Sequence, residues 1–266
     1  MNISYFTEFL TQERFLFLGI ITIFGAIMGS FATALIYRLP RDINWVSKRS
    51  ECTICNHKLG VLDLIPIFSY IISRGKCRYC GTKYGFTYFI IEALVAISFF
   101  ISFYFLTIPE ALITGFLAFA IIILSAIDFE HYIIPDEVNI FIFVLGAINS
   151  YVNNLEISDF AINCFTYLGI SLLLRWSVFL WKKREGLGLG DVKLFLASGA
   201  FLSIELLPIY LFLSGFSGLI LAIFWRLFKK SEIFPFGPCL SFALLLCVIF
   251  PQITNWLNYF LIQNLN

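Results

Sequence analysis

The sequence has few charged side chains. Only 13% of its 266 residues are Asp, Glu, Lys or Arg, whereas 60% are hydrophobic and the mean hydropathy is +0.90. A soluble domain of ordinary composition is about 25% charged and about 45–50% apolar. Because the apolar excess extends over most of the chain, the composition excludes a globular domain with a single anchor. It predicts a polytopic membrane protein.

Long polar stretches are also lacking, with residues 38–85 as the one exception. A membrane-spanning helix needs roughly 20 mostly apolar residues. Eight segments approach this length: 15–37, 86–106, 111–127, 138–152, 160–181, 192–207, 209–228 and 238–259. The sequence therefore predicts an all-α membrane helix bundle of about eight transmembrane helices. We expect a first transmembrane helix within residues 1–37, a small cytoplasmic domain at 38–85 and a transmembrane core at 86–266.

The N-terminal stretch lacks the basic region of a secretory signal peptide and carries Glu8, Glu13 and Arg14 instead. We therefore expect the first span to be retained. Basic residues are lacking from every second loop of an eight-span topology. Sixteen of the eighteen Lys and Arg fall on one side, nine of them in the loop after the first span. The positive-inside rule identifies that side as cytoplasmic.

The polar segment contains a near-repeat of two Cys-x-x-Cys turns. CTICNHKLG at 52–60 matches CRYCGTKYG at 77–85 with an offset of 25 residues. Asn56 and Gly81, which follow the turns, tolerate the left-handed backbone that such turns often need. Two turns of this kind make a four-sulfur structural zinc site, with ligands Cys52, Cys55, Cys77 and Cys80. Two disulfides are the alternative, which a reducing cytoplasm disfavours. His57 is expected to be a solvated loop residue.

Ionisable side chains in apolar segments are costly and are therefore candidates for function. Asp128 ends the third predicted span and Asp191 begins the sixth, so both fall at the cytoplasmic edge. Two carboxylates that meet at low dielectric share a proton. The ionised one can then take a proton from water while the protonated one polarises a scissile carbonyl. Glu92 is a further candidate for orienting a substrate, with an ion pair to Arg175 as the structural alternative.

Glycines precede Asp191 in GLGLGDVKL at 186–194. Gly188 and Gly190 allow a substrate backbone or a neighbouring helix to approach Asp191 closely. A phosphate-binding loop is disfavoured, because no strand precedes the segment and the third glycine of G-x-G-x-x-G is missing. The alternative is that Asp191 is the N-cap of a helix and the glycines are a linker. Asp136, after Pro135, is expected to begin a helix.

Several segments together resemble one family, the type IV prepilin peptidases, also called prepilin leader peptidase/N-methyltransferases. The segments occur in family order over most of the chain. They are GSFATALIYRLP at 29–40, the cysteine-bearing stretch at 49–92, IDFEHYIIPD at 127–136, GLGLGDVKLFLASGA at 186–200 and FPFGPCLSFA at 234–243. The resemblance implies a membrane aspartic endopeptidase of the G-x-G-D class with Asp128 and Asp191 as its catalytic pair.

The same resemblance implies the substrates and the second activity. The enzyme would sit in the bacterial inner membrane and cleave the short basic leader of type IV prepilins and pseudopilins, including those of type II secretion, at the cytoplasmic face. Members with the four cysteines also N-methylate the new N-terminus with S-adenosylmethionine. The sequence has no separate methyl-donor fold or glycine-rich nucleotide motif, so methylation rests on the resemblance. Lipid is an expected partner and nucleic acid is not.

Two other classes of protein stay open on the residues themselves. Asp128, Asp191 and Glu92 could relay protons or bind cations in a transporter or channel. Transport predicts an acidic residue near the bilayer midplane and discontinuous helices there. A non-catalytic, zinc-bearing assembly protein is the third hypothesis, although it gives no reason for two aspartates to converge.

Overall fold

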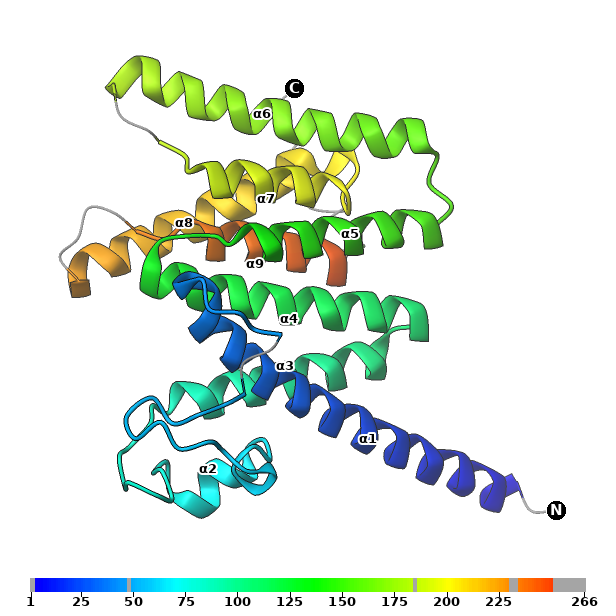
Figure 1. The fold of residues 1–266 in the computed structure, drawn as a ribbon. Coiled ribbons are helices and arrows are strands. Elements are labelled where there is room, and N and C mark those ends of the chain that lie inside the picture. Colours follow the sequence, from blue (N-terminus) through cyan, green and yellow to red (C-terminus); the bar gives the residue numbers. More distant parts are fainter. Residues whose placement is uncertain (1–2, 47–48, 184–185, 230–233, 251–266) are drawn as a thin grey trace. The chain divides into compact units, whose positions relative to one another are not determined.

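The chain folds into helices joined by mostly short connections (Figure 1). The computed structural model describes residues 3–46, 49–183, 186–229 and 234–250. In these ranges the β-structure is limited to two isolated bridges, which confirms the predicted all-α class. The chain divides into two compact units, residues 1–123 and 124–266. The division by activity at residues 37 and 85 stays a prediction, because compactness measures packing and not function.

The first unit is built around two long helices. Helix α1 (Ile3–Arg38) packs along α3 (Thr87–Phe105), and the first part of α4 (Ile108–His131) follows. The close approach of α1 and α3 depends on glycine, since a Cβ added at Gly29 would lie 2.6 Å from the Cα atom of Glu92. Between α1 and α3 lie η1 (Leu39–Arg41), η2 (Val61–Asp63) and the short helix α2 (Phe68–Ser73).

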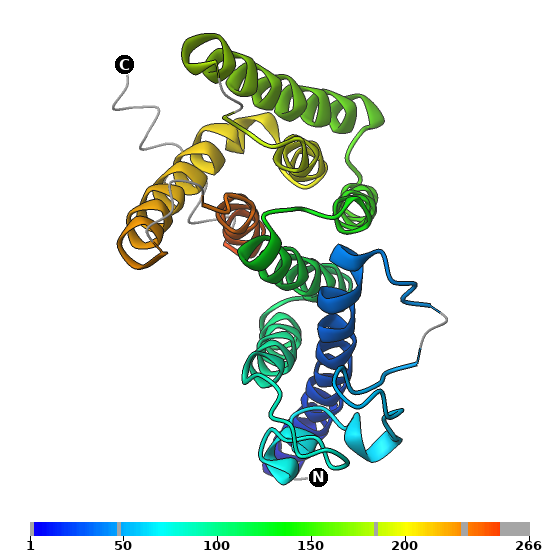
Figure 2. The same cartoon turned by 60° about the vertical axis from the view of Figure 1, so that its left-hand side comes forward.

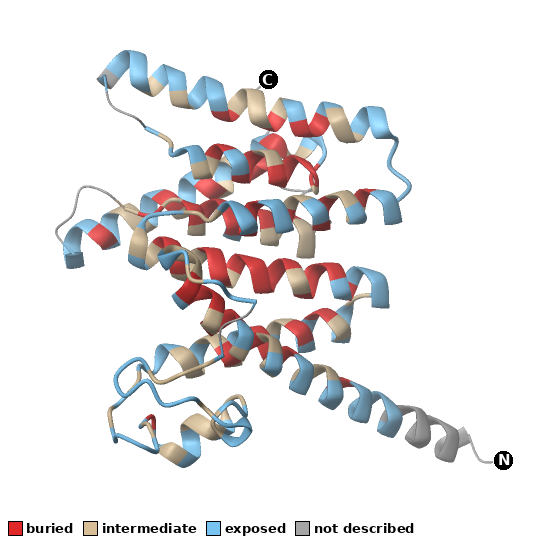
Figure 3. Cartoon of the chain, in the orientation of Figure 1, coloured by how far each residue is buried: buried red, intermediate tan, exposed pale blue. Residues whose placement is uncertain are grey.

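The second unit surrounds a short buried helix. It contains the end of α4, then α5 (Asp136–Val152), α6 (Ile157–Lys182), α7 (Leu189–Gly199), α8 (Leu207–Lys229) and α9 (Gly237–Ile249). Helix α7 lies between α5 and α6 and also contacts α9 (Figures 1 and 2). Figure 3 shows buried residues along α7 and α9, where apolar side chains such as Leu194, Phe195 and Leu240 are fully enclosed. The start of α7, with Asp191, is thus attached to the core of this unit.

A helix lies at each of the eight predicted segments, and among the described residues five helices are long and apolar enough to cross a membrane. They are Gln12–Arg41, Thr87–Phe105, Ile108–His131, Ile157–Trp181 and Ile204–Lys229. These five define a multi-pass membrane protein. Helix α5 has 17 residues and α7 has 11. At 1.5 Å per residue they measure about 26 Å and about 17 Å, less than the hydrocarbon thickness of about 30 Å.

The predicted end of the sixth segment, at residue 207, is wrong. Helix α7 ends at Gly199, and η3 (Ile204–Leu206) leads into α8. Apolar residues continue through this turn because the turn is itself packed in the core, so hydrophobicity alone does not reveal the break. At Gly199 a Cβ would lie 2.9 Å from the Cα atom of Cys164 in α6, a close helix contact. Of the last predicted segment, residues 251–259 lie outside the described residues.

Candidate active site

Asp128 lies in the last turn of α4, with 4% of its surface exposed. Its Oδ2 accepts a hydrogen bond of 3.0 Å from the backbone N–H of Gly237, the first residue of α9. The first N–H groups of a helix have no partner within the helix and carry partial positive charge. The start of α9 therefore holds one carboxylate oxygen of Asp128 in a fixed position.

Asp191 is the third residue of α7, and its Oδ2 accepts a hydrogen bond of 3.1 Å from the backbone N–H of Gly188. Gly188 is the N-cap and has an extended backbone. The alternative that Asp191 is itself the N-cap is therefore wrong. Its contact is the one that the third helical residue makes in a capping box. Asp191 thus supports the helix start with one oxygen.

The two aspartates are far apart in sequence and close in space. The charge of Asp191 acts on the carboxyl group of Asp128. Ile134 lies between the two helix starts that carry this site: a Cβ at Gly190 would be 2.9 Å from Ile134 Cβ, and one at Gly237 would be 2.8 Å from Ile134 Cδ1. Glycine at both positions lets the starts of α7 and α9 approach the segment between α4 and α5. The expected role of Gly188 and Gly190 in substrate approach stays a prediction.

Helix α5 supplies two side chains to the start of α7. The Nδ2 of Asn139 donates to the carbonyl oxygen of Gly190 at 3.3 Å, and Lys193 Nζ pairs with Asp136 Oδ1 at 2.6 Å. Asp136 begins α5, as predicted. Asn139 is 4% exposed, and its Oδ1 has no hydrogen-bond partner among the described residues. Sequence reasoning missed Asn139, although a buried amide in an apolar helix one turn after Asp136 is a usable signal.

Arg175 also acts on the glycine-rich segment. Its Nη1 donates to the carbonyl oxygen of Leu187, directly before the start of α7. The predicted alternative paired Arg175 with Glu92. The carboxylate of Glu92 instead accepts a hydrogen bond of 2.6 Å from the backbone N–H of Ile67. Each side chain therefore has a partner near its own place in the fold.

The four predicted cysteines form one cluster in the first unit. The sulfur atoms of Cys52, Cys55, Cys77 and Cys80 all lie within 4.8 Å of one another, and the Cys52 and Cys80 sulfurs are 3.9 Å apart. Zinc–sulfur bonds of about 2.3 Å in a tetrahedron put the sulfurs about 3.8 Å apart. The donor set and its spacing therefore fit a metal ion. Disulfides, the alternative, are not formed, since all four cysteines are free.

The sequence repeat is a structural repeat. Glu51 pairs with Lys58 in one antiparallel bridge, and Lys76 pairs with Lys83 in another, again 25 residues on. Each turn is followed by a residue with positive φ, Asn56 at 55° and Gly81 at 72°. This confirms the left-handed backbone expected at both positions. Two copies of one loop thus present two thiols each to a common centre.

The surroundings of the cluster favour thiolates at two of its positions. A hydrogen bond with the Thr82 hydroxyl, followed by the Thr82 backbone, lowers the pKa of Cys80 to about 6. Backbone N–H groups of Cys55 and Ile54 lower the pKa of Cys52. Thiolates are the form that binds metal. His57 is exposed, stacks on the ring of Tyr79 with 3.5 Å between ring centroids, and is no part of the cluster.

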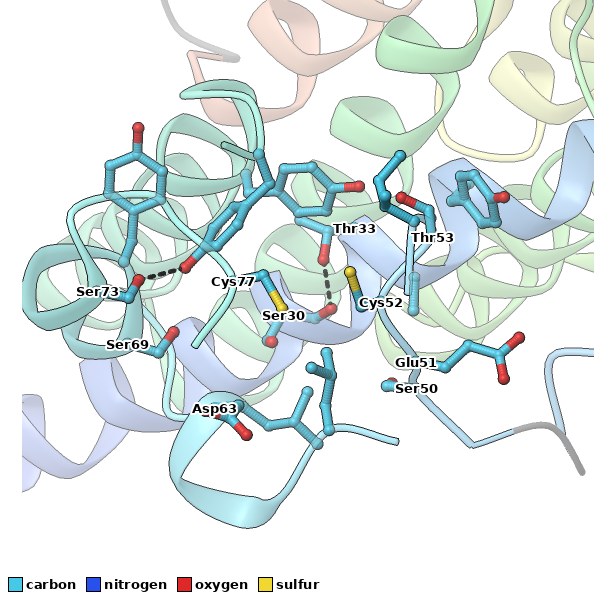
Figure 4. Close-up of a pocket in the computed structure, with 18 of the residues that line it drawn as sticks. Ser30, Thr33, Ser50, Glu51, Cys52, Thr53, Asp63, Ser69, Ser73 and Cys77 are labelled. Atoms are coloured by element: carbon cyan, nitrogen blue, oxygen red, sulfur yellow. Dashed lines mark hydrogen bonds between the residues drawn. The ribbon is translucent and has the colours of Figure 1, made fainter. Parts of the chain in front are cut away.

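A cavity of about 400 Å³ adjoins the cysteine cluster in the first unit (Figure 4). Its lining includes Ser30 and Thr33 of α1, the metal-site residues Cys52 and Cys77, and Glu92 of α3. Glu92 is only 7% exposed. Its predicted role in orienting a substrate stays a prediction, and the structure adds that Glu92 borders a cavity large enough for a small molecule.

Buried carboxylates at the ends of membrane helices, together with a separate four-thiol cluster, define a class: a polytopic membrane protein with an acidic site and a metal-binding domain. Two family models match the chain. Residues 23–106 match the bacterial peptidase A24 N-terminal domain, and residues 115–223 match the type IV leader peptidase family.

Named relatives agree with these models. The chain is 34% identical over 233 residues to a prepilin leader peptidase/N-methyltransferase of Vibrio cholerae serotype O1, covering 82% of this chain and 89% of that protein. It is 29% identical over 243 residues to a type 4 prepilin-like proteins leader peptide-processing enzyme of Escherichia coli O78:H11, covering 83% and 89%. The chain belongs to the type IV leader peptidase family, which confirms the resemblance. No solved structure matches it.

Proposed function

We propose that the protein is a membrane aspartic endopeptidase that removes the leader of prepilins and pilin-like proteins. The observation that carries the proposal is the meeting of Asp128 and Asp191 from separate helices, with one oxygen of each bound to a backbone N–H group. The remaining oxygens can then act on water and on a peptide bond. The relatives are named for the processing of prepilin leaders.

The proposed mechanism uses the two carboxyl groups in different protonation states. The ionised carboxylate takes a proton from a water molecule, whose oxygen attacks the scissile carbonyl carbon. The protonated partner donates a hydrogen bond to the carbonyl oxygen and stabilises the charge that develops there. Two carboxylates at close range in a buried site cannot both ionise, which maintains this division. We assign these roles to the pair and not to either member alone.

Charge supports a cytoplasmic active site in an inner membrane. Figure 1 shows the end of α6 and the start of α7 on the same side of the second unit, opposite the connection between α5 and α6. The first side carries Lys183 and Lys193, while the opposite connection carries Glu156 and Asp159. Basic residues mark the cytoplasmic side. A substrate with a basic leader before an apolar helix would present its cleavage site at this edge.

The cysteine cluster supports a bound zinc ion with a structural role. Four protein sulfurs complete a tetrahedral shell and leave no open position for substrate. The ion would hold together the two loops of a segment that has little apolar core of its own. We also propose that the protein N-methylates the new N-terminus. S-adenosylmethionine supplies the methyl group to that amine, and the named relatives carry the same second activity.

The test of the peptidase uses the full chain in liposomes with a purified prepilin. Asp128→Asn and Asp191→Asn should each lower the cleavage rate by at least about 100-fold, the contribution expected of a general acid or base. Asparagine keeps the acceptor oxygen that the N–H of Gly237 or Gly188 needs, so folding should be retained. Cleavage and methylation are read together by mass spectrometry of the product.

Asp136→Asn is the matched control. This carboxylate is exposed, pairs with Lys193 and lies eight positions from Asp128. Its loss should leave cleavage within about twofold of wild type, because exposed ion pairs contribute little. Full cleavage by either Asp128→Asn or Asp191→Asn would exclude the shared-proton mechanism.

A further inference from the structure

The cavity in the first unit is separate from the aspartate pair and has no role in the proposed cleavage. It is bordered by α1, by both cysteine loops, by α2 and by the start of α3 (Figure 4). One wall consists of Ser30, Thr33 and Ala34 of α1, and another of Cys52 and Cys77. Its volume of about 400 Å³ lies within the range of small-molecule sites.

The walls combine aromatic rings, hydroxyl groups and charges of both signs. Four tyrosines contribute: Tyr37, Tyr70, Tyr84 and Tyr88. Five basic residues border the cavity, Arg38, Arg49, Lys76, Arg78 and Lys83, against three acidic ones, Glu51, Asp63 and Glu92. The excess of two positive charges disfavours a basic leader peptide as the occupant. The mixture favours a small ligand that has an aromatic ring and carries both a carboxylate and a positive charge.

Several of these groups are already fixed in place. Ser73 and Tyr84 share a hydrogen bond of 2.8 Å, and Asp63 forms an ion pair with Arg78 at 3.2 Å. Glu92 holds the N–H of Ile67, whose φ of 65° is rare for a β-branched residue. A wall of preorganised groups loses little entropy when a ligand binds.

We propose that this cavity is the binding site of the methyl donor, S-adenosylmethionine. The inference rests on the proposed methylation and identifies the site for it. The adenine ring suits the tyrosine faces, and the sulfonium suits both tyrosine faces and a carboxylate. The donor's own carboxylate suits the surrounding Lys and Arg side chains. Because Cys52 and Cys77 belong to the wall, the metal cluster supports the shape of the methyl-donor site while remaining remote from the cleavage chemistry.

The test fills the cavity without removing any of its interactions. Ala34→Phe adds a ring from α1, and Ser69→Phe adds one from α2; both positions line the cavity and are half-buried. Ile27→Phe is the control, since Ile27 is 52% exposed on α1 and does not border the cavity. Binding of radiolabelled S-adenosylmethionine to the full chain in nanodiscs is measured by equilibrium dialysis, and zinc content and prepilin cleavage are measured on the same samples.

Wild type and Ile27→Phe should bind the donor alike, whereas each cavity-filling variant should bind at least tenfold more weakly and keep its zinc and its cleavage rate. Donor binding at wild-type strength in both Ala34→Phe and Ser69→Phe would overturn the assignment. Wild-type protein that cuts prepilin but does not bind the donor would also overturn it while leaving the peptidase proposal intact. Loss of cleavage in the Asp→Asn variants, with donor binding retained, is the converse result and supports both.

Discussion

Gly237→Ala should impair cleavage more than its small size suggests. A Cβ at this position would lie 2.8 Å from Oδ2 of Asp128 and 2.8 Å from Cδ1 of Ile134, where ordinary contacts begin at 3.4 Å. Ile134 can rotate its terminal methyl group away. The carboxylate, which is 4% exposed and bound to the N–H of Gly237 itself, has to retreat by about 0.6 Å or give up that bond.

A misplacement of about 1 Å can cost about 100-fold in rate, so we expect a loss of about 10- to 100-fold in kcat/KM. Overpacking should also lower the free energy of unfolding by about 1–3 kcal/mol. The assay is prepilin cleavage by the full chain in liposomes, with thermal unfolding followed on the same samples. Gly215→Ala in α8 is the control, because a Cβ there meets no atom within 4 Å. If Gly237→Ala cleaves like Gly215→Ala, Asp128 does not depend on the position fixed by α9, and the geometric reasoning fails.

Three further predictions concern the supports of the two units. Lys193→Ala removes an exposed ion pair of α7 and should change the free energy of unfolding by less than about 1 kcal/mol in denaturant titrations, so a larger loss would contradict this estimate. Gly29→Ala should destabilise by about 1–3 kcal/mol because its methyl group meets the backbone of α3, whereas Gly19→Ala, which meets nothing within 4 Å, should be neutral or stabilising; equal melting temperatures would refute the packing argument. Replacing Cys52 and Cys77 together by Ser should abolish bound zinc in elemental analysis while prepilin cleavage persists, and metal-free wild-type protein would refute the zinc site.

The apolar segments were predictable because a spanning helix is defined by length and composition alone. All eight predicted segments contain a helix, and the start of α9 was placed within one residue. The cysteine loops were predictable for a different reason. A repeat of short-range spacing determines a local turn, so the offset of 25 residues reappears in both bridges and both positive φ values. The short length of α7 was not predictable, since the turn after Gly199 is as apolar as the helix before it.

The sequence by itself determined that this protein is helical, that it belongs in a membrane, and which carboxylates and thiols deserve a function. These properties depend on neighbouring residues and on transfer to lipid, which local sequence encodes. Only the tertiary structure decided that the start of α9 binds Asp128, that Asn139 and Arg175 hold the segment before Asp191, and that a cavity lies against the cysteine loops. Such contacts join residues 12 to more than 100 positions apart, and their geometry follows from how the helices pack.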